Sequence, residues 1–347
     1  MLAMSAFRFS PRVAALALCA CLPAFAQDAL SVVRDNRTPP LMNALNLIAE
    51  GAGFYKEANL KVTNVLTETA LEALQACNAG KGDICPVGIE PLISRYDEGV
   101  HMKMFFTRAS KFGYVIGVPV DSPYKTLADL KGHKIGVHST TGTSAVFTTE
   151  SSLKAAGLKP GDYELVTIGL EDEAVGKLRS GQVVAAALPF YELIPFMVAG
   201  LNLRILRHPT LGEYANAGYA SSPAIIAAKE DSLRRFSRCI VKASLLVRYN
   251  PAAAAKALLV GDGKPFTDAD VQRKTTELKF WEDDLPAADP DNKRIGAMSL
   301  TGMQAYIQLM KDTGITKTAM PASLIVTDQF IEYANDFDHK SIAKYGK

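Results

Sequence analysis

The chain has 347 residues, of which 48% are hydrophobic and 21% are charged, and its formal net charge is +2. This length suits two ordinary domains, each with its own core. A nearly neutral chain lacks the field that would hold nucleic acid or an anionic membrane surface by net charge, so we expect neither as a partner.

Residues 1–26 have the pattern of an export signal. Arg8 and Arg12 precede the apolar run VAALALCACLPAFA, which is too short to span a bilayer, and AFA before Gln27 is an A-x-A cleavage site. An alternative is a lipobox in LCAC with Cys21 acylated, which we disfavour because a second cysteine interrupts it and its apolar core would be short. Cleavage would leave 36 basic and 36 acidic residues. We expect a periplasmic protein.

Cysteine and histidine spacing gives no sign of a metal or a cofactor. Three cysteines follow the signal, and an odd number in an oxidising compartment leaves at least one thiol free. We expect Cys77, Cys85 and Cys239 to be buried as apolar side chains, and the sequence leaves open whether the first two form a disulfide. The five histidines share no ligand spacing with one another or with the cysteines.

Strand and helix patterns alternate along the chain, which is typical of parallel sheets covered by helices. We expect these elements in chain order: strand 30–34, helix 39–58, strand 60–66, helix 69–80, strand 84–88, strand 134–138, helix 143–157, strand 163–169, helix 171–181 and strand 183–188. Thr69 and Glu72 have capping-box spacing. Residues 112–123 and 217–229 are candidate crossings between two lobes, and a helical tail with Trp281 as a packing anchor follows.

A weak internal repeat supports two lobes of similar plan. Residues 79–105 align without a gap with residues 180–206, and the pattern of helix, buried strand, short helix and strand recurs. We therefore expect a first lobe from residues 27–117 and 220–347 and a second lobe from residues 118–219. Under this alignment Glu90 and Tyr191 are counterparts, and we expect them to face each other across a cleft.

Candidate ligand-binding residues follow four predicted strands, because ligands of open α/β sheets bind beyond the carboxyl ends of the strands. They are Asn36, Arg37 and Thr38; Gly88 and Glu90; His138, Ser139, Thr140, Thr141, Gly142, Thr143 and Ser144; and Phe190, Tyr191 and Glu192. The hydroxyl-rich loop before the helix at 143–157 could cradle an anion with N–H and hydroxyl donors, or could simply cap that helix.

The other candidates also carry two interpretations. Arg37 is either a solvated loop arginine or a bidentate partner of a carboxylate or sulfonate. Phe190 and Tyr191 either belong to the core or stack on a planar ligand. Glu90 and Glu192 suit a ligand that carries an amine beside its anionic group. No serine lies in a G-x-S-x-G elbow and no cysteine has an evident activating partner, so we expect no enzyme activity.

Several segments together carry a family resemblance: IAEGAGFYKEANLKV, LQACNAGKGDICPVG, TLADLKGHKIGVHSTTGTSA, LKAAGLKPGDYELV and VGKLRSGQVVAAALPFYE. From about residue 30 to 250 the chain resembles the periplasmic substrate-binding proteins of ABC importers, in the branch that serves nitrate, sulfonates, taurine and thiamine precursors. It departs from that pattern at Val183 and Val184, where an acidic residue is common.

The resemblance implies an α/β, bilobed periplasmic-binding-protein fold of type II. Such a fold has two parallel-rich sheets flanked by helices and a two-strand hinge that closes on a small molecule. We expect a monomer that delivers a small organic anion or zwitterion, such as a sulfonate, a taurine-like molecule or a carboxylate, to an ABC importer permease in the inner membrane. The alternatives are a binding protein for a thiamine-precursor pyrimidine and, against the export signal, an enzyme that makes that pyrimidine. The sequence does not name the ligand.

Overall fold

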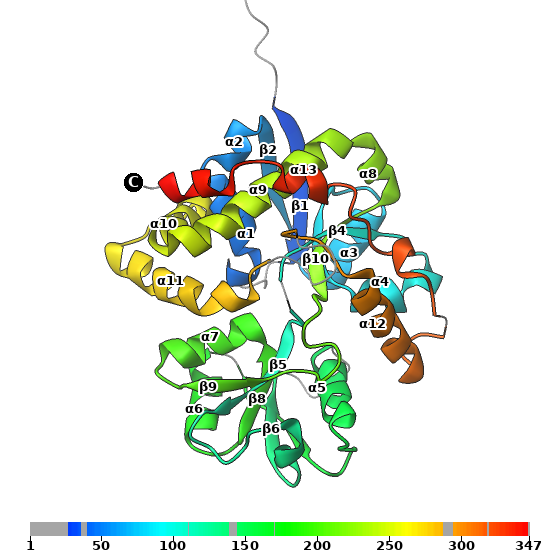
Figure 1. Cartoon of the computed structure of the whole chain (residues 1–347), viewed down its shortest axis with the longest axis vertical. Helices are drawn as coiled ribbons and strands as arrows, with labels where there is room; N and C mark the ends of the chain where they lie inside the picture. The colour runs from blue at the N-terminus through cyan, green and yellow to red at the C-terminus, as the bar shows by residue number, and fades with distance from the viewer. Residues whose placement is uncertain are drawn as a thin grey trace, which may run out of the picture.

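The structure is a computed structural model that describes residues 27–35, 40–109, 111–138, 144–169, 171–286, 294–317 and 319–345. Two lobes lie one above the other in Figure 1, and the smaller, lower lobe is built from the middle of the chain. The upper lobe holds both β1 and the C-terminal helices. Cys77, Cys85 and Cys239 are buried and free, which confirms the expectation that they are apolar side chains of the interior.

The upper lobe has two small sheets joined by a parallel bridge between Val32 and Ile84. In the first, β1 (Asp28–Asp35) pairs in parallel with β2 (Leu60–Thr67). In the second, β10 (Ala217–Ser221) lies between β3 (Cys85–Gly88) and β4 (Lys103–Thr107) and is antiparallel to both. The spatial order across the lobe is therefore β2-β1-β3-β10-β4.

Helices cover these sheets and form the tail that crosses the upper lobe in Figure 1. Early in the chain they are α1 (Ala44–Gly51), α2 (Phe54–Glu57), α3 (Ala70–Asn78) and α4 (Glu90–Ser94). Those of the tail are α8 (Pro223–Ala228), α9 (Glu230–Tyr249), α10 (Pro251–Asp262), α11 (Asp268–Trp281), α12 (Leu300–Asp312) and α13 (Ile331–Asn335). Short 3-10 turns are η1 (Pro40–Asn43), η2 (Tyr96–Glu98), η3 (Leu127–Leu130), η4 (Glu282–Asp284), η5 (Ala322–Leu324) and η6 (His339–Lys344).

Local sequence signals explain where two early helices begin and end. The Thr69 hydroxyl accepts a hydrogen bond from the Glu72 backbone N–H at 3.2 Å, so the predicted cap of α3 is present. The single helix expected over 39–58 is instead divided into η1, α1 and α2. Gly53 has φ of 77° between α1 and α2, a left-handed conformation that ends one helix and lets the next start in another direction.

The lower lobe is one five-stranded sheet with three helices. Its strands are β5 (Tyr114–Pro119), β6 (Lys134–Val137), β7 (Glu164–Thr167), β8 (Ala185–Pro189) and β9 (Leu203–Leu206). Their spatial order is β7-β6-β8-β5-β9, with β5 antiparallel to both of its neighbours. Its helices are α5 (Ser144–Ala155), α6 (Glu171–Arg179) and α7 (Phe190–Val198).

The two lobes repeat the same strand plan, as the internal repeat in the sequence predicts. In each, one antiparallel strand lies next to the strand at the outer edge, β10 beside β4 above and β5 beside β9 below. Gly88 at the end of β3 pairs with the first residue of β10, and its repeat counterpart, Pro189 at the end of β8, pairs with the first residue of β5. The repeat therefore marks structurally equivalent positions.

Each segment that the sequence indicated as a crossing contains a strand of one lobe, β5 in residues 112–123 and β10 in residues 217–229. Strand β5 lies wholly in the lower sheet and β10 wholly in the upper second sheet, because each is hydrogen-bonded to strands on both sides. We therefore move the expected lobe boundaries to just before Tyr114 and just before Ala217. A hydrogen bond also joins the two crossing regions, since the Arg207 guanidinium donates to the Phe112 carbonyl at 3.0 Å.

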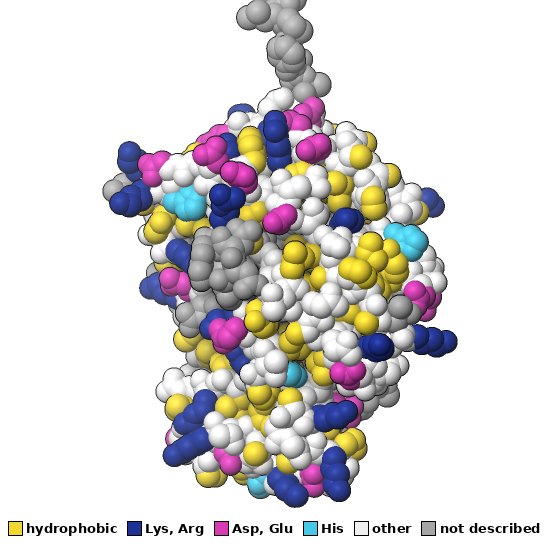
Figure 2. Space-filling view, turned by 45° about the vertical axis from the view of Figure 1, so that its right-hand side comes forward, with side chains coloured by type: hydrophobic (Ala, Val, Ile, Leu, Met, Phe, Trp, Pro, Cys, Tyr) yellow, Lys and Arg dark blue, Asp and Glu magenta, His cyan; other side chains and the backbone are white. Residues whose placement is uncertain are grey.

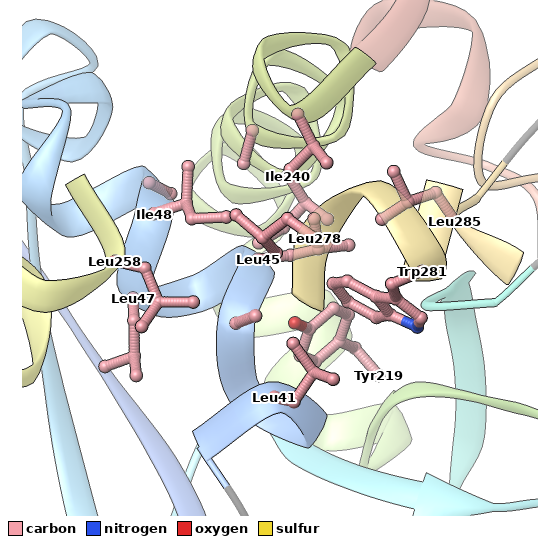
Figure 3. Packing of buried hydrophobic residues seen from close by; sticks show 14 of the residues in the cluster. Leu41, Leu45, Leu47, Ile48, Tyr219, Ile240, Leu258, Leu278, Trp281 and Leu285 are labelled. Atoms are coloured by element: carbon pink, nitrogen blue, oxygen red, sulfur yellow. The ribbon is translucent and has the colours of Figure 1, made fainter. Parts of the chain in front are cut away.

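The largest buried cluster extends from the upper lobe into the lower one. Figure 3 shows Leu278 and Trp281 of α11 packed beside Leu45 of α1 and Ile240 of α9. The same cluster includes Leu193 and other side chains of α7, and α7 packs against α11. An apolar contact thus joins the lobes in addition to the two chain crossings.

The molecular surface agrees with the balanced charge of the sequence. Figure 2 shows lysine, arginine, aspartate and glutamate side chains interspersed over the face in view, on both lobes. Among the described residues, no helix has the length and apolar character needed to cross a membrane.

The contact between α1 and α10 depends on two glycines and gives a prediction about stability. A Cβ atom at Gly51 would lie 1.9 Å from the Ala257 carbonyl oxygen, and one at Gly261 would lie 2.1 Å from the Leu47 carbonyl oxygen. Gly51→Ala and Gly261→Ala should each lower the free energy of unfolding by about 1–3 kcal/mol, because the helices must move apart.

The matched control is Gly176→Ala in α6, where nothing lies within 4 Å of the new Cβ atom. It should raise the free energy of unfolding by about 0.5–1 kcal/mol through better helix propensity. Urea denaturation of the three variants measures both effects. Equal gains from all three substitutions would show that α1 and α10 are not in backbone contact.

Candidate functional site

A cavity of about 620 Å³ lies between the lobes, and its wall is built largely at the carboxyl ends of strands. The upper lobe contributes the end of β1, the end of β3, the segment after β4 and the first turns of α3. The lower lobe contributes the start of β5 and the segment after β8. Charged and aromatic side chains of the wall include Arg34, Glu90, Arg108, Tyr114, Tyr191 and Trp281.

Three partly buried arginines line the cavity, and Arg95 among them is paired with Glu98 at 2.8 Å, so Arg34 and Arg108 are the two that matter here. The Arg34 guanidinium donates to the Asp35 carbonyl at 3.5 Å, and that of Arg108 donates to the Met42 carbonyl at 3.2 Å. The Nε atoms of both arginines are buried and have no hydrogen-bond partner among the described residues. Burial lowers the pKa of Arg34, although Asp262 and Asp35 oppose the shift. A buried cationic group with an unpaired donor is costly, and both arginines line the cavity, where an anion would compensate their charge.

Glu90 is one of two buried carboxyl groups among the described residues that line the cavity, the other being Asp284. Glu90 is the first residue of α4 and is 7% exposed. Its Oε1 atom accepts hydrogen bonds from the Asn216 amide at 2.9 Å and from the Tyr306 hydroxyl at 2.7 Å. Burial raises the pKa of Glu90, and these hydrogen bonds together with the charge of Arg108 oppose the rise. The carboxyl group is thus fixed in place beside a cation.

Asn216 connects Glu90 to both crossings. Its side-chain oxygen accepts a hydrogen bond from the Gly113 N–H at 2.8 Å, and its backbone carbonyl accepts one from the Ile89 N–H at 2.8 Å. Asn216 itself ends the return crossing, while Gly113 ends the outward one. One buried side chain therefore fixes the positions of the two crossings and the start of α4 relative to one another.

His138 and Glu192 form a second polar pair, in the lower lobe. His138 follows β6, Glu192 lies in the first turn of α7, and His138 Nδ1 is 3.1 Å from Glu192 Oε2. The hydrogen bond with Glu192 raises the pKa of His138, and partial burial opposes the rise. The two side chains contact each other and are not among the described residues that line the cavity.

The structure brings together some of the residues that the sequence singled out. Gly88, Glu90 and Tyr191 line the cavity, and the Tyr191 hydroxyl reaches across to the Met42 sulfur at 3.5 Å. Phe190 belongs to the buried core, with the Arg207 guanidinium 5.6 Å from its ring centre. Trp281 is buried in the same core, as expected of a packing anchor, and it also reaches the cavity wall.

The remaining candidates lie outside the described residues or have no described side chain. Ser144 begins α5, but its side chain is not described. The others in this group are Asn36, Arg37, Thr38, Ser139, Thr140, Thr141, Gly142 and Thr143. Their proposed role in holding a polar group stays a prediction.

The sequence analysis missed Arg34, Arg108 and Asn216. Arg34 is the last residue of the strand expected at 30–34. The alternation of apolar and polar residues alone does not show which face of the sheet its side chain lies on. Arg108 directly follows β4, so the same rule of strand ends would have found it had KMFFT been treated as a fifth candidate strand. Asn216 lies in a crossing without periodicity and has no local signal.

Two lobes of matched strand order around a shared cavity define the type II class of periplasmic-binding-protein folds, and solved structures agree. The alkanesulfonate-binding protein SsuA from Xanthomonas axonopodis pv. citri, bound to MOPS, is 20% identical with a TM-score of 0.59, covering 86% of this chain and 98% of that one. The periplasmic aliphatic sulphonate binding protein SsuA from Escherichia coli is 20% identical with a TM-score of 0.63, covering 85% and 96%.

The same fold also serves an enzyme. A mutant of DSZB, a desulfurization enzyme, in complex with biphenyl-2-sulfinic acid is 16% identical with a TM-score of 0.57, covering 89% of this chain and 99% of that one. Among curated protein sequences, none matches this chain. The family model described as NMT1/THI5 like matches residues 43–254, more than half of the chain, and the chain therefore belongs to that family.

The His138 and Glu192 pair predicts a pH dependence of stability. Because the folded-state pKa of His138 is raised, the pair stabilises the fold in full below the usual histidine pKa of about 6.5. That stabilisation is lost as the pH rises through the raised folded-state value. The difference in unfolding free energy between the native chain and His138→Gln should therefore be larger at pH 5.5 than at pH 8.5.

Glu192→Gln is the matched partner variant. Its unfolding free energy should differ from that of the native chain in the same way, by more at pH 5.5 than at pH 8.5, since either substitution removes the ion pair. Urea denaturation at the two pH values measures the effect. A difference between the native chain and His138→Gln that stays constant over this range would mean that the pair does not form in solution.

Proposed function

We propose that the chain is an extracytoplasmic solute-binding protein that captures a small organic anion or zwitterion and delivers it to an ABC importer permease. The observation that carries the proposal is the pair of cavity arginines, Arg34 and Arg108, whose buried Nε donors lack acceptors among the described residues. A sulfonate or carboxylate accepts several charge-assisted hydrogen bonds at once and fits such donors. Membership of the NMT1/THI5-like family and structural similarity to two sulfonate-binding proteins support this ligand class.

Glu90 favours a ligand that also carries a positive group. Its carboxyl group lines the same cavity as the two arginines, so an ammonium group a few atoms away from the anionic head would meet an acceptor there. A zwitterion that joins an amine to a sulfonate or a carboxylate has this arrangement. An aminopyrimidine is the second candidate, since Tyr114 and Tyr191 place aromatic rings in the same wall.

Binding without catalysis is supported by the state of the thiols near the cavity. Cys85 lines the wall, and its buried thiol donates to the Val33 carbonyl at 3.6 Å. A hydrogen bond with Cys85, together with burial, raises the pKa of Cys77 far above its usual value. A nucleophilic cysteine requires a lowered pKa, so Cys77 is not activated in the manner of a catalytic thiol.

Periplasmic location is part of the proposal and rests on residues 1–26, which lie outside the described residues. Their arginine-flanked apolar run and the AFA site before Gln27 support export and cleavage, with acylation at Cys21 as the less favoured alternative. We propose that the mature chain acts as a monomer that meets the permease at the inner membrane.

The test is the effect of removing Arg34 or Arg108 on anion binding. Isothermal titration of the native chain should detect at least one of taurine, methanesulfonate, benzenesulfonate and benzoate. Arg34→Gln and Arg108→Gln should each weaken that binding by about ten- to a hundredfold, because a hydrogen bond to a charged group is lost.

The control is Arg234→Gln, which makes the same charge change on the exposed side of α9. It should leave the affinity unchanged, and melting curves should show that all three variants are folded. Failure of the native chain to bind any of the four anions, or equal affinity in all variants, would contradict the proposal.

A further inference from the structure

We infer, on the basis of the proposed function, that the ligand is an anion with an aromatic or similarly bulky apolar body. Inorganic anions and two-carbon sulfonates are a poor match for this cavity. Its volume of about 620 Å³ lies within the range of roughly 300–1,000 Å³ that encloses drug-sized ligands. At about 30 Å³ for each water molecule, a taurine-sized ligand would leave most of the cavity to solvent.

The chemistry of the wall agrees with this size argument. The arginines and acidic side chains form only part of it, and most of the remainder is apolar. Three separate segments contribute that apolar part, namely the first turns of α3, the segment from β3 to α4, and the start of α7. Representative side chains are Leu71, Leu74, Val87, Pro91 and Pro189. Burial of this apolar surface contributes most to the binding free energy when the ligand is large enough to exclude water from it.

Aromatic side chains come from both lobes. Tyr114 and Tyr191 belong to the lower lobe, and Trp281 ends α11 of the upper lobe. Burial raises the pKa of both tyrosines well above the usual value, so their rings stay neutral. Rings that line a cavity offer a planar ligand a large contact area with little loss of side-chain freedom.

The rim of the cavity is apolar as well. Leu71, in the first turn of α3, lines the cavity although its side chain is 41% exposed. An exposed leucine at the entrance adds apolar contact for a ligand that extends beyond the arginines. It also offers a position that can be changed without touching the buried core.

The test uses one anionic head on bodies of different size. Trp281 is the only tryptophan of the chain, so its fluorescence reports directly on occupation of the cavity, and isothermal titration gives the affinities. We expect benzenesulfonate to bind about ten- to a hundredfold more tightly than methanesulfonate or taurine, and biphenyl-4-sulfonate at least as tightly as benzenesulfonate.

A variant at Leu71 distinguishes the contribution of apolar contact to binding from that of the anionic head. Leu71→Ser should weaken the binding of benzenesulfonate about three- to tenfold and leave methanesulfonate unchanged. The control is Leu300→Ser, which removes a 55% exposed leucine of α12 that does not line the cavity, and it should change neither affinity.

The outcomes separate this inference from the proposed function. If methanesulfonate or taurine binds as tightly as benzenesulfonate, the inference is wrong and the solute-binding function stands. If none of the four sulfonates and no benzoate binds to the native chain, the proposed function fails with it. If Leu71→Ser weakens the binding of benzenesulfonate and of methanesulfonate by the same factor, the inference is also overturned. Leu71 would then support the groups that bind the sulfonate head and would not contact the apolar body of the ligand.

Discussion

The hydrogen bonds of Asn216 are the constraint on which the site depends. This one side chain holds the end of the outward crossing through Gly113 and the buried carboxyl group through Glu90, while its backbone holds Ile89. Because Glu90 and Ile89 are buried, losing the partner of either would leave an unsatisfied polar group as well as a broken bond. The cavity therefore has a rigid base at the junction where the two lobes meet.

The apolar contact between α7 and α11 adds a second constraint on the lobes. Side chains of both helices belong to the same buried cluster, and Trp281 at the end of α11 belongs both to that cluster and to the cavity wall. A hinge motion between the lobes must either keep this contact or expose part of it to water. Trp281 is therefore the side chain through which the cavity wall contacts the apolar cluster shared by the two lobes.

Much of the fold could be predicted from local sequence signals. Alternating strand and helix patterns and the repeat of residues 79–105 anticipate two lobes with the same strand plan, and Thr69 marks the start of α3. The sequence indicated crossings at residues 112–123 and 217–229 but did not show that β5 and β10 within them are antiparallel strands of one sheet each, because periodicity alone does not show which sheet a strand joins. The division of the first helix followed from the backbone of Gly53, whose conformation no side-chain pattern encodes.

The site was less predictable because its contacts connect distant segments. Glu90 and Tyr191 were found from the ends of their strands, but the partners of Glu90 lie 126 and 216 residues away in the sequence, at Asn216 and Tyr306. No local pattern encodes such a pairing. The unpaired donors of Arg34 and Arg108 are likewise a property of the packed structure, since either arginine taken alone is compatible with a solvated surface position.

The most direct measurement of the central claim is a crystal structure of the protein grown with benzenesulfonate. The account predicts sulfonate oxygens within hydrogen-bond distance of the guanidinium groups of Arg34 and Arg108, with the ring against the apolar wall that includes Tyr191. A sulfonate bound elsewhere, with both guanidinium groups turned away from it, would contradict the account.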